Sequence, residues 1–178
     1  MLTCELTEAN TTGFEIYCDM DGVLVDFNNG VTKVMNDPEF DVLQKKHRAN
    51  FWKLLNEIPE QEAIDIWANF EWVPGGKELW RYVSRFNPGI LSSPGNIARD
   101  RVEKGKMLWI KKNLNPKPSK ILFSVNKWKH AHQFGILIDD HDKHLIPWEE
   151  KGGVAIRYKT GDYKSAIQEL QGRFGFPK

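Results

Sequence analysis

The most informative part of the sequence is Tyr17-Cys18-Asp19-Met20-Asp21-Gly22-Val23-Leu24. An apolar run ends here in two carboxylates, Asp19 and Asp21, which are separated by one residue and followed by a glycine. Residues i and i+2 of an extended chain point to the same side. Two carboxylates placed in this way repel each other unless a cation lies near them, and Gly22 permits a sharp turn. The stretch therefore predicts a buried strand that carries a charged site at its carboxyl end.

Other short apolar runs, separated by Pro and Gly, alternate along the chain with helical patterns. The runs that predict strands are Phe14–Cys18, Gly89–Leu91, Lys120–Val125, Gly135–Ile138 and Gly153–Arg157. The patterns that predict helices between them are Lys77–Phe86, Ile97–Asn113 and Tyr163–Gln171. This alternation favours an α/β fold of the Rossmann-like kind, with a parallel sheet flanked by helices.

Residues 29–72 break the alternation, because they contain helical patterns and no convincing strand. The patterns cover Val31–Asn36, Arg48–Asn56 and Gln61–Phe70, and Asp37-Pro38 and Ile58-Pro59 separate them. We therefore expect a small helical cap at 29–72, inserted after the first strand, and a core domain formed by 1–28 and 73–178.

A second pair of carboxylates, Asp139-Asp140, follows the apolar run Gly135–Ile138, and Ser92 with Ser93 follows the run that ends at Leu91. In an open parallel sheet, ligands bind beyond the carboxyl ends of the strands. All-oxygen ligation by carboxylates suits Mg²⁺. Backbone and hydroxyl groups at the serines can hold an anion, and a lysine of the next helix, Lys104 or Lys106, can offset the charge of a phosphoryl group.

Composition bounds the class of protein. The chain has 178 residues, 40% of them hydrophobic, and a net charge of +1. This length and hydrophobic content predict one ordered domain, and the lack of a long apolar run excludes a membrane-spanning helix. The first ten residues contain no Lys or Arg, so no secretory leader is expected. The only cysteines, Cys4 and Cys18, cannot form a disulfide framework, which favours the cytoplasm.

The charges are unevenly distributed. Residues 99–129 contain ten Lys and Arg against two Asp and Glu, a net charge of +8, which leaves the rest of the chain at −7. Such an excess can attract the phosphate of a nucleotide or of a polymer, although it is also typical of a solvated helix face. The presumed cap carries eight acidic residues against four basic ones from Asp37 to Glu71, which opposes binding of a polyanion.

The ordered set of Asp-x-Asp, Ser, Lys and Asp-Asp resembles the four motifs of the haloacid dehalogenase-like (HAD) superfamily of phosphohydrolases, over about 14–170. Asp19-Met20-Asp21-Gly22-Val23 resembles the first motif, Ser92 the second, Lys106 the third and Asp139-Asp140 the fourth. Within the superfamily, the chain is most similar to the 5'(3')-deoxyribonucleotidases of bacteria and phages. The stretches that carry this similarity are 19–27, Ile90-Leu91-Ser92-Ser93-Pro94, Lys106 with Trp109, and 136–140.

The resemblance implies a mechanism. Asp19 would be the nucleophile that forms an aspartyl-phosphate, and Asp21 the general acid and then the general base. Mg²⁺ would be held by Asp19, the backbone carbonyl of Asp21 and the pair Asp139-Asp140, with Asp140 favoured as the direct ligand. The phosphoryl oxygens would be bound by Ser92, Ser93 and Lys106. An acid at the position of Asp21 disfavours the dehalogenase branch of the superfamily.

The expected substrate is a (deoxy)nucleoside monophosphate, with Phe27 and Trp72 as the pocket aromatics that could stack on its base. The alternatives are an enzyme that removes phosphate from polynucleotide ends, a phosphatase for sugar phosphates or other small esters, and a nucleotide-binding module without catalysis. No membrane partner is expected. The relatives are often dimers, so a homodimer is an expectation to which the sequence assigns no surface.

Overall fold

The computed structural model of the chain describes residues 13–178. Residues 1–12 lie outside the described part. They include Cys4 and the first ten residues, which we did not expect to form a secretory leader. The core is one parallel sheet in the order β3-β2-β1-β4-β5. Its strands are β1 Glu15–Cys18, β2 Gly89–Ser92, β3 Ile121–Phe123, β4 Gly135–Asp139 and β5 Val154–Arg157. The predicted α/β fold is confirmed, and each strand falls on one of the five predicted runs.

The central strand β1 is hydrogen-bonded on both sides, which explains why its apolar residues are continuous rather than alternating. Cys18 lies opposite Ile90 of β2 and opposite Ile138 of β4, and Ile16, Cys18, Ile90 and Ile138 are completely buried. In this register, the polar residues that follow the apolar part of each strand reach the same edge of the sheet.

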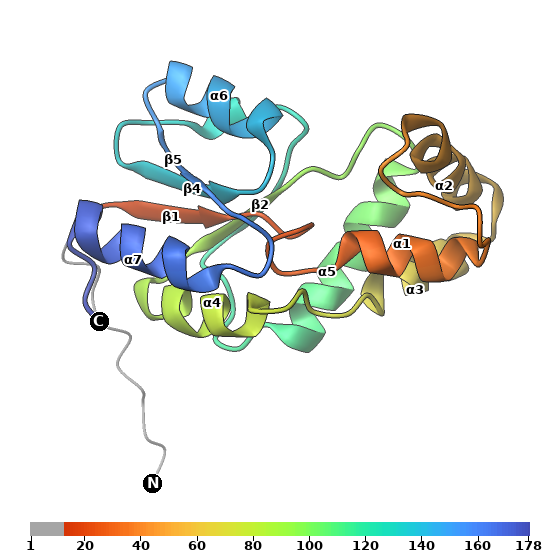
Figure 1. Cartoon of the computed structure of the whole chain (residues 1–178), viewed down its shortest axis with the longest axis horizontal. Coiled ribbons are helices and arrows are strands. Elements are labelled where there is room, and N and C mark those ends of the chain that lie inside the picture. The colour runs from red at the N-terminus through yellow and green to blue at the C-terminus, as the bar shows by residue number, and fades with distance from the viewer. Residues whose placement is uncertain (1–12) are drawn as a thin grey trace, which may run out of the picture.

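Helices cover both faces of the sheet (Figure 1). On one face lie α4 Gly76–Val83, which continues into the short 3-10 helix η1 Ser84–Phe86, and α7 Tyr163–Phe174. On the other face lies α6 Asp142–Glu150, which packs on β4, on β5 and on the 3-10 helix η2 Lys127–His130. The helix α5 Arg99–Asn113 follows β2, begins beyond the carboxyl ends of the strands and runs back toward the sheet, where β3 follows (Figure 1).

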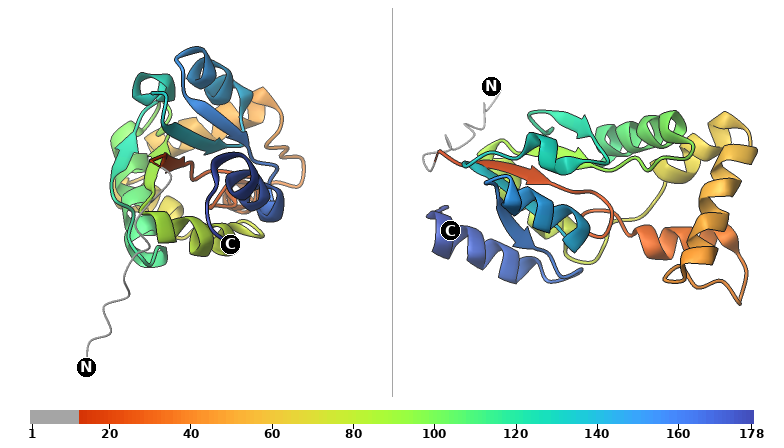
Figure 2. Two further views of the ribbon diagram at one scale, coloured as in Figure 1. Left: turned by 90° about the vertical axis from the view of Figure 1, so that its left-hand side faces the viewer. Right: turned by 90° about the horizontal axis from the view of Figure 1, so that it is seen from above.

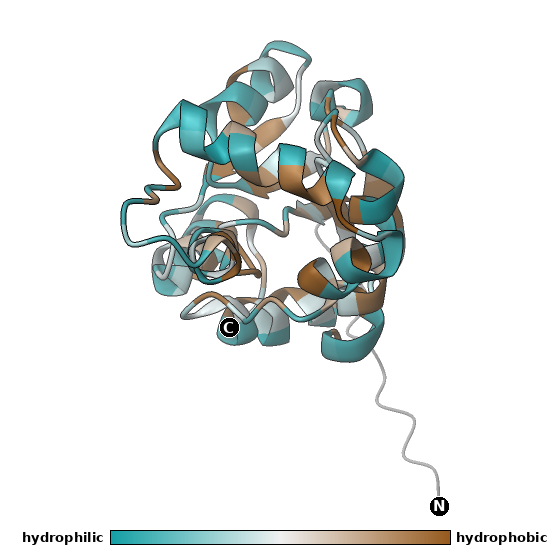
Figure 3. Cartoon of the chain, turned by 90° about the vertical axis from the view of Figure 1, so that its right-hand side faces the viewer, coloured by the Kyte–Doolittle hydropathy of each residue, from teal (hydrophilic) through white to brown (hydrophobic). Residues whose placement is uncertain are grey.

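The elements that residues 29–72 contribute are all helices, the first of which begins two residues earlier, at Phe27. These helices are α1 Phe27–Met35, α2 Lys45–Glu57 and α3 Glu60–Ala68. Figures 1 and 2 show them beyond the carboxyl end of β1, at the opposite end of the molecule from the chain terminus marked C. Figure 3 views the molecule from the helical end and shows the helices striped with hydrophobic and hydrophilic residues. We call these helices, α1 to α3, the helical segment.

The helical segment is fastened to α5 of the core. Gly105 lets α3 approach so closely that a Cβ at this position would lie 2.4 Å from the Cβ of Trp67. Trp109 Nε1 donates a hydrogen bond to Phe70 O at 2.8 Å. Arg101 donates to the carbonyl oxygens at the end of α2, those of Leu55 and Ile58. Backbone, aromatic and guanidinium contacts therefore hold the segment against the core.

No helix among residues 13–178 has both the length and the apolar composition needed to cross a membrane.

Candidate active site

The loop after β1 is a tight turn that brings Asp19 and Asp21 to the edge of the sheet. The backbone N–H groups of Val23, Leu24 and Val25 all donate to Met20 O, which closes the turn. Gly22 has a φ of +78°, and a Cβ at this position would lie 2.2 Å from Oδ2 of Asp140. A glycine is therefore required here both by the backbone conformation and by the close approach of Asp140.

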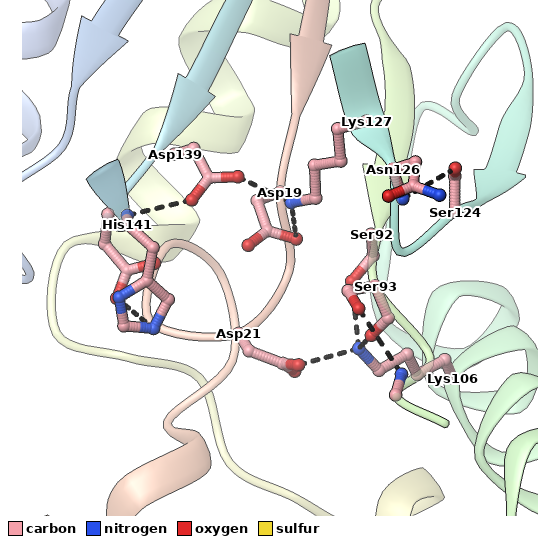
Figure 4. Close-up of polar contacts among 12 residues, drawn as sticks. Asp19, Asp21, Ser92, Ser93, Lys106, Ser124, Asn126, Lys127, Asp139 and His141 are labelled. Carbon is pink, nitrogen blue, oxygen red and sulfur yellow. Dashed lines mark hydrogen bonds and ion pairs between the residues drawn. The ribbon is translucent and has the colours of Figure 1, made fainter. Parts of the chain in front are cut away.

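Asp19 lies in a buried ionic network that the sequence reasoning missed in part. Lys127, the first residue of η2, places its Nζ 2.8 Å from Asp19 Oδ1 and 2.6 Å from Asp139 Oδ2 (Figure 4). Lys127 and Asp139 are completely buried, and Asp19 is 3% exposed. The available signal was a lysine four residues after the end of β3, in a chain where Asp19 directly follows β1 and Asp140 directly follows β4.

The charges of this network determine the ionisation of its members. Burial would raise the pKa of Asp19, but Lys127 and Lys106 outweigh it and lower that pKa below the ordinary value. Burial would lower the pKa of Lys127, and Asp19 with Asp139 raises it instead. Asp19 is therefore a carboxylate, and Lys127 an ammonium ion, over the physiological range of pH.

Asp21 belongs to a second buried pair. Lys106, whose side chain is completely buried, donates from Nζ to Asp21 Oδ2 at 2.7 Å, to Ser92 Oγ at 2.9 Å and to Ser93 O at 2.8 Å (Figure 4). Burial raises the pKa of Asp21, Lys106 lowers it and Asp19 raises it, with a net shift upward. The structure thus brings together four of the predicted site residues, and gives the two carboxylates of the first motif opposite pKa shifts.

The predicted acidic pair lies beside them. Burial and the nearby carboxylate of Asp19 raise the pKa of Asp139 to about 6 and that of Asp140 to about 7. Carboxylate oxygens of Asp19, Asp139 and Asp140 come within 4.8 Å of one another. Asp139 already accepts hydrogen bonds from Lys127 Nζ and from His141 N, at 2.6 and 2.9 Å. Asp140 Oδ1 and Asp21 Oδ1, by contrast, are buried without a hydrogen-bond partner in the described chain.

These observations fit a divalent cation. The four carboxylates of the site face the two buried ammonium groups of Lys106 and Lys127, which leaves a formal charge of −2. Burial is the main cause of the raised pKa values of Asp139 and Asp140, and repulsion by the neighbouring carboxylates adds to it. Buried oxygens, a hard donor set and a net negative charge are the properties of a Mg²⁺ site.

A cavity of about 480 Å³ opens above Asp19 and Asp21. The remaining lining residues are Phe27, Arg48, Trp52, Ser93, Gly95, Asn96, Ile97, Val125, His141, Lys143 and His144. A smaller adjoining cavity of about 110 Å³ shares Asp21, Phe27, Arg48 and His141 with it. A hollow of about 500 Å³ between α1 and α3 is lined by none of the predicted catalytic residues. The first two cavities are therefore the candidate substrate site.

The two predicted pocket aromatics have different positions. Phe27 lines the cavity, with its ring centroid 5.5 Å from that of Trp67 and 6.2 Å from that of Trp52. Trp72 does not line it, and packs instead on Trp109 with the ring centroids 4.8 Å apart. Trp52 of α2 lines the cavity instead. Trp72, at the junction of cap and core, forms a backbone bridge with Val25.

Two histidines also reach the site. His144 lines the cavity, and burial together with Lys127 lowers its pKa to about 3, so its imidazole is neutral. Burial and Lys143 lower the pKa of His141, which lies beside Asp140. His141, directly after the acidic pair in sequence, therefore belongs to the surroundings of the site.

Comparisons with known proteins reveal similarity of fold. No protein-family model matches the chain, and no curated protein matches it. A solved dehalogenase with an intermediate complex has a TM-score of 0.56 and 11% identity, over 92% of this chain and 97% of that one. A HAD-superfamily hydrolase of subfamily IA from Geobacter sulfurreducens has a TM-score of 0.52 and 13% identity, over 90% and 98%. One from Ehrlichia chaffeensis has 0.51 and 15%, over 88% and 96%. The fold is thus that of the HAD-superfamily hydrolases.

Proposed function

We propose that the protein is a Mg²⁺-dependent phosphomonoesterase that acts on (deoxy)nucleoside monophosphates through an aspartyl-phosphate, as a 5'(3')-deoxyribonucleotidase does. One observation carries the proposal. Asp19 and Asp21 lie two residues apart at the edge of the sheet, each paired with its own buried lysine, and their pKa values are shifted in opposite directions. Such a separation of pKa values divides the roles of nucleophile and acid between two carboxylates.

Asp19 is the proposed nucleophile. Its ionised carboxylate attacks phosphorus, a new O–P bond forms, and the bond from phosphorus to the ester oxygen of the substrate breaks. Lys127 holds the attacking carboxylate in position, because its Nζ lies 2.8 Å from Asp19 Oδ1. Hydrolysis of the aspartyl-phosphate by water then releases inorganic phosphate and restores Asp19.

Asp21 is the proposed general acid and base. Its raised pKa favours the protonated form, which can give a proton to the departing alcohol and later take one from the attacking water. Lys106 fixes the carboxyl group, and it also reaches the end of β2, where Ser92 and Ser93 lie. In this proposal Ser92, Ser93 and Lys106 bind the phosphoryl oxygens and stabilise the charge that develops on them.

The metal would be held by Asp19, by Asp140 and by the backbone carbonyl of Asp21. Asp139 is not proposed as a direct ligand, because both of its oxygens already accept hydrogen bonds. It would instead hold Lys127 and the loop at His141 in place beside the metal. When bound, Mg²⁺ supplies positive charge that draws the phosphoryl group to Asp19 and offsets the formal charge of −2 on the site.

Because some of the similar structures are dehalogenases, the choice between dehalogenation and phosphoryl transfer depends on this chain's own residues. A phosphoryl transfer needs a proton donor for the leaving alcohol and a cation for the phosphoryl charge, and Asp21 and the acidic cluster provide for both. The substrate proposal rests on the cavity: Phe27 and Trp52 offer ring surfaces within about 480 Å³ beside Asp19, and aromatic rings bind nucleobases by stacking.

The test is phosphate release from a panel of substrates, with and without Mg²⁺. The panel contains ribo- and deoxyribonucleoside monophosphates, sugar phosphates and phosphorylated oligonucleotides. We expect Mg²⁺-dependent release that is highest for deoxynucleoside monophosphates and is abolished by Asp19→Asn with the fold intact. Release from oligonucleotides alone would favour an end-processing phosphatase. Stabilisation by nucleotides without any release would favour a binding module and contradict the proposed reaction.

A further inference from the structure

Two cations line the cavity and have no part in the chemistry proposed above. Arg48 comes from α2 of the helical segment, and Lys143 comes from the first turn of α6 in the core. In the part of the chain that the structure describes, neither side chain forms an ion pair with a carboxylate. Unpaired cations on two separate elements thus border the same cavity as Asp19 and Asp21.

Arg48 is held in place on one side only. Its Nε donates a hydrogen bond to Val42 O at 3.2 Å, so the two Nη groups remain available. Arg48 also lines the smaller adjoining cavity, and therefore stands where the two cavities meet. A planar guanidinium with two free N–H₂ groups is suited to bind a phosphate through two hydrogen bonds.

Lys143 and Arg48 act on a common region. Both line the larger cavity, and His141, two residues before Lys143, lines both cavities together with Arg48. The two cations therefore converge on one side of the site, although they belong to different layers of the molecule. An anionic group bound near His141 would lie within the field of both.

Other groups are proposed to bind the phosphoryl group that is attacked. These are Ser92, Ser93 and Lys106, at the end of β2. Arg48 and Lys143 border the cavity in addition to them, and can therefore bind a different anionic group of the substrate.

We infer that the preferred substrate carries a second phosphate, which binds between Arg48 and Lys143 while the first phosphoryl group is attacked by Asp19. This inference rests on the proposed function and narrows its substrate class. The second phosphate has two sources with the same chemistry: the 3'-phosphate of a nucleoside 3',5'-bisphosphate, and the internucleotide phosphate next to a 5'-phosphorylated end. The competing explanation is that both cations merely attract any phosphate, in which case they act equally on monophosphates.

The experiment compares kcat/KM for release of the 5'-phosphate from three substrates in the presence of Mg²⁺, with the products identified. The substrates are thymidine 5'-monophosphate, thymidine 3',5'-bisphosphate and a 5'-phosphorylated thymidine dinucleotide. We expect the wild type to prefer a substrate with a second phosphate by about tenfold, and Arg48→Gln and Lys143→Gln each to reduce this preference severalfold. The matched control is Lys53→Gln, an exposed position on α2 that does not line the cavity and keeps the preference.

The outcomes separate the hypotheses. Preference for the bisphosphate alone identifies a small-molecule substrate, and equal preference for the dinucleotide identifies a strand end. Equal kcat/KM for all three substrates, or equal losses for all three in Arg48→Gln, would overturn the inference and leave the proposed function standing. If p-nitrophenyl phosphate and all three substrates are inert, the proposed function fails. Calorimetry then decides the inference, because tighter binding of the bisphosphate that is lost in Arg48→Gln supports it and equal binding refutes it.

Discussion

At the scale of single residues, Lys127 is the side chain on which most of the site depends. It is buried between Asp19 and Asp139, and its removal would leave two carboxylates without a cation. Breaking a buried ion pair by removing one partner costs about 3–5 kcal/mol. We therefore expect Lys127→Met to lower the free energy of unfolding by about that amount, measured in urea, and to reduce kcat/KM by at least about a thousandfold.

The matched control for this substitution is Lys129→Met, which removes an exposed lysine two residues further along η2. Its stability and kinetics should stay near those of the wild type. If Lys127→Met unfolds at the same urea concentration as the control, Lys127 is not the cation that the carboxylates require.

Asp140 gives the site a dependence of stability on pH. Its pKa of about 7 in the folded protein lies above the ordinary value of 3.8, because burial and Asp19 disfavour its ionised form. Between these two pH values the unfolded chain ionises while the folded protein keeps its proton, so the metal-free protein loses stability as pH rises through this window. Mg²⁺ favours the ionised carboxylate and should reverse this loss.

We therefore expect Asp140→Asn to stabilise the metal-free protein more at about pH 8 than at about pH 4.5. At the higher pH the free energy of unfolding should rise by about 1–3 kcal/mol, and the Tm should rise with it. Added Mg²⁺ should stabilise the wild type and have little effect on the variant. Thermal scans with a chelator and with Mg²⁺ measure both effects, with Glu150→Gln, an exposed carboxylate at the end of α6, as the control. A Tm shift that is the same at both pH values would contradict this account.

The sequence was most informative about residues that follow an apolar strand directly. Asp19, Asp21, Ser92, Asp139 and Asp140 could be predicted as neighbours because parallel strands end at one edge of the sheet. Lys127 and Trp52 were missed because each stands on an element that the pattern did not connect to that edge. A lysine after a three-residue strand and a tryptophan on an inserted helix lie near Asp19 only through tertiary packing.

At the scale of secondary-structure elements, the contact between α3 and α5 determines how the helical segment sits on the core. Gly105 is the point of closest approach, with a potential Cβ 2.4 Å from Trp67 Cβ and 2.7 Å from Ile64 O. Gly105→Ala must push α3 away, and overpacking of this kind costs about 1–3 kcal/mol. Because Trp67 contacts Phe27 of the cavity, we also expect the KM for nucleotides to rise.

Urea unfolding and steady-state kinetics test this expectation, and the chain supplies a matched control. Gly172 lies inside α7 with no atom within 4 Å of a potential Cβ. Gly172→Ala should stabilise the protein by up to about 1 kcal/mol, because alanine favours the helix. Equal effects of the two substitutions would mean that α3 and α5 are not in firm contact.

The elements themselves could be predicted unevenly. The five strands and the helices α4, α5 and α7 followed from hydrophobic patterns bounded by Pro and Gly. The helix α6 was missed because Pro147 lies inside it, and a proline within a helix removes a hydrogen-bond donor and ordinarily marks an end. The helix forms because Leu145 and Trp148 pack on the sheet with Tyr17 and Leu137, which is a tertiary effect.

At the scale of the whole molecule, most of the cations in residues 99–129 form hydrogen bonds or ion pairs within the protein. Eight of its ten cations have a partner among the described residues: Arg99, Arg101, Lys104, Lys106, Lys112, Lys117, Lys120 and Lys127. Lys106 and Lys127 belong to the candidate active site, and Lys104 pairs with Glu60 of the helical segment. Most of the cations in this stretch are therefore engaged in contacts within the chain.

This distribution predicts a shallow dependence of catalysis on salt. A substrate that contacts the protein through one or two phosphates should give a slope of log kcat/KM against log salt concentration between about 0 and −2. The measurement uses the preferred substrate over a range of NaCl concentrations at constant Mg²⁺. A slope steeper than about −4 would show that many phosphates are bound and would favour a polymer substrate.

The helix α5 has two tasks within a few residues: Lys106 serves the catalytic centre, while Gly105 and Trp109 hold the helical segment. Because of this arrangement, the inserted helices cannot be exchanged independently of α5. A graft that exchanged residues 29–72 for the corresponding segment of another protein of this fold would meet an α5 surface shaped for Trp67, Ile64 and Phe70. Recombination between members of this fold should therefore succeed only when the insertion and α5 are exchanged together, as one segment.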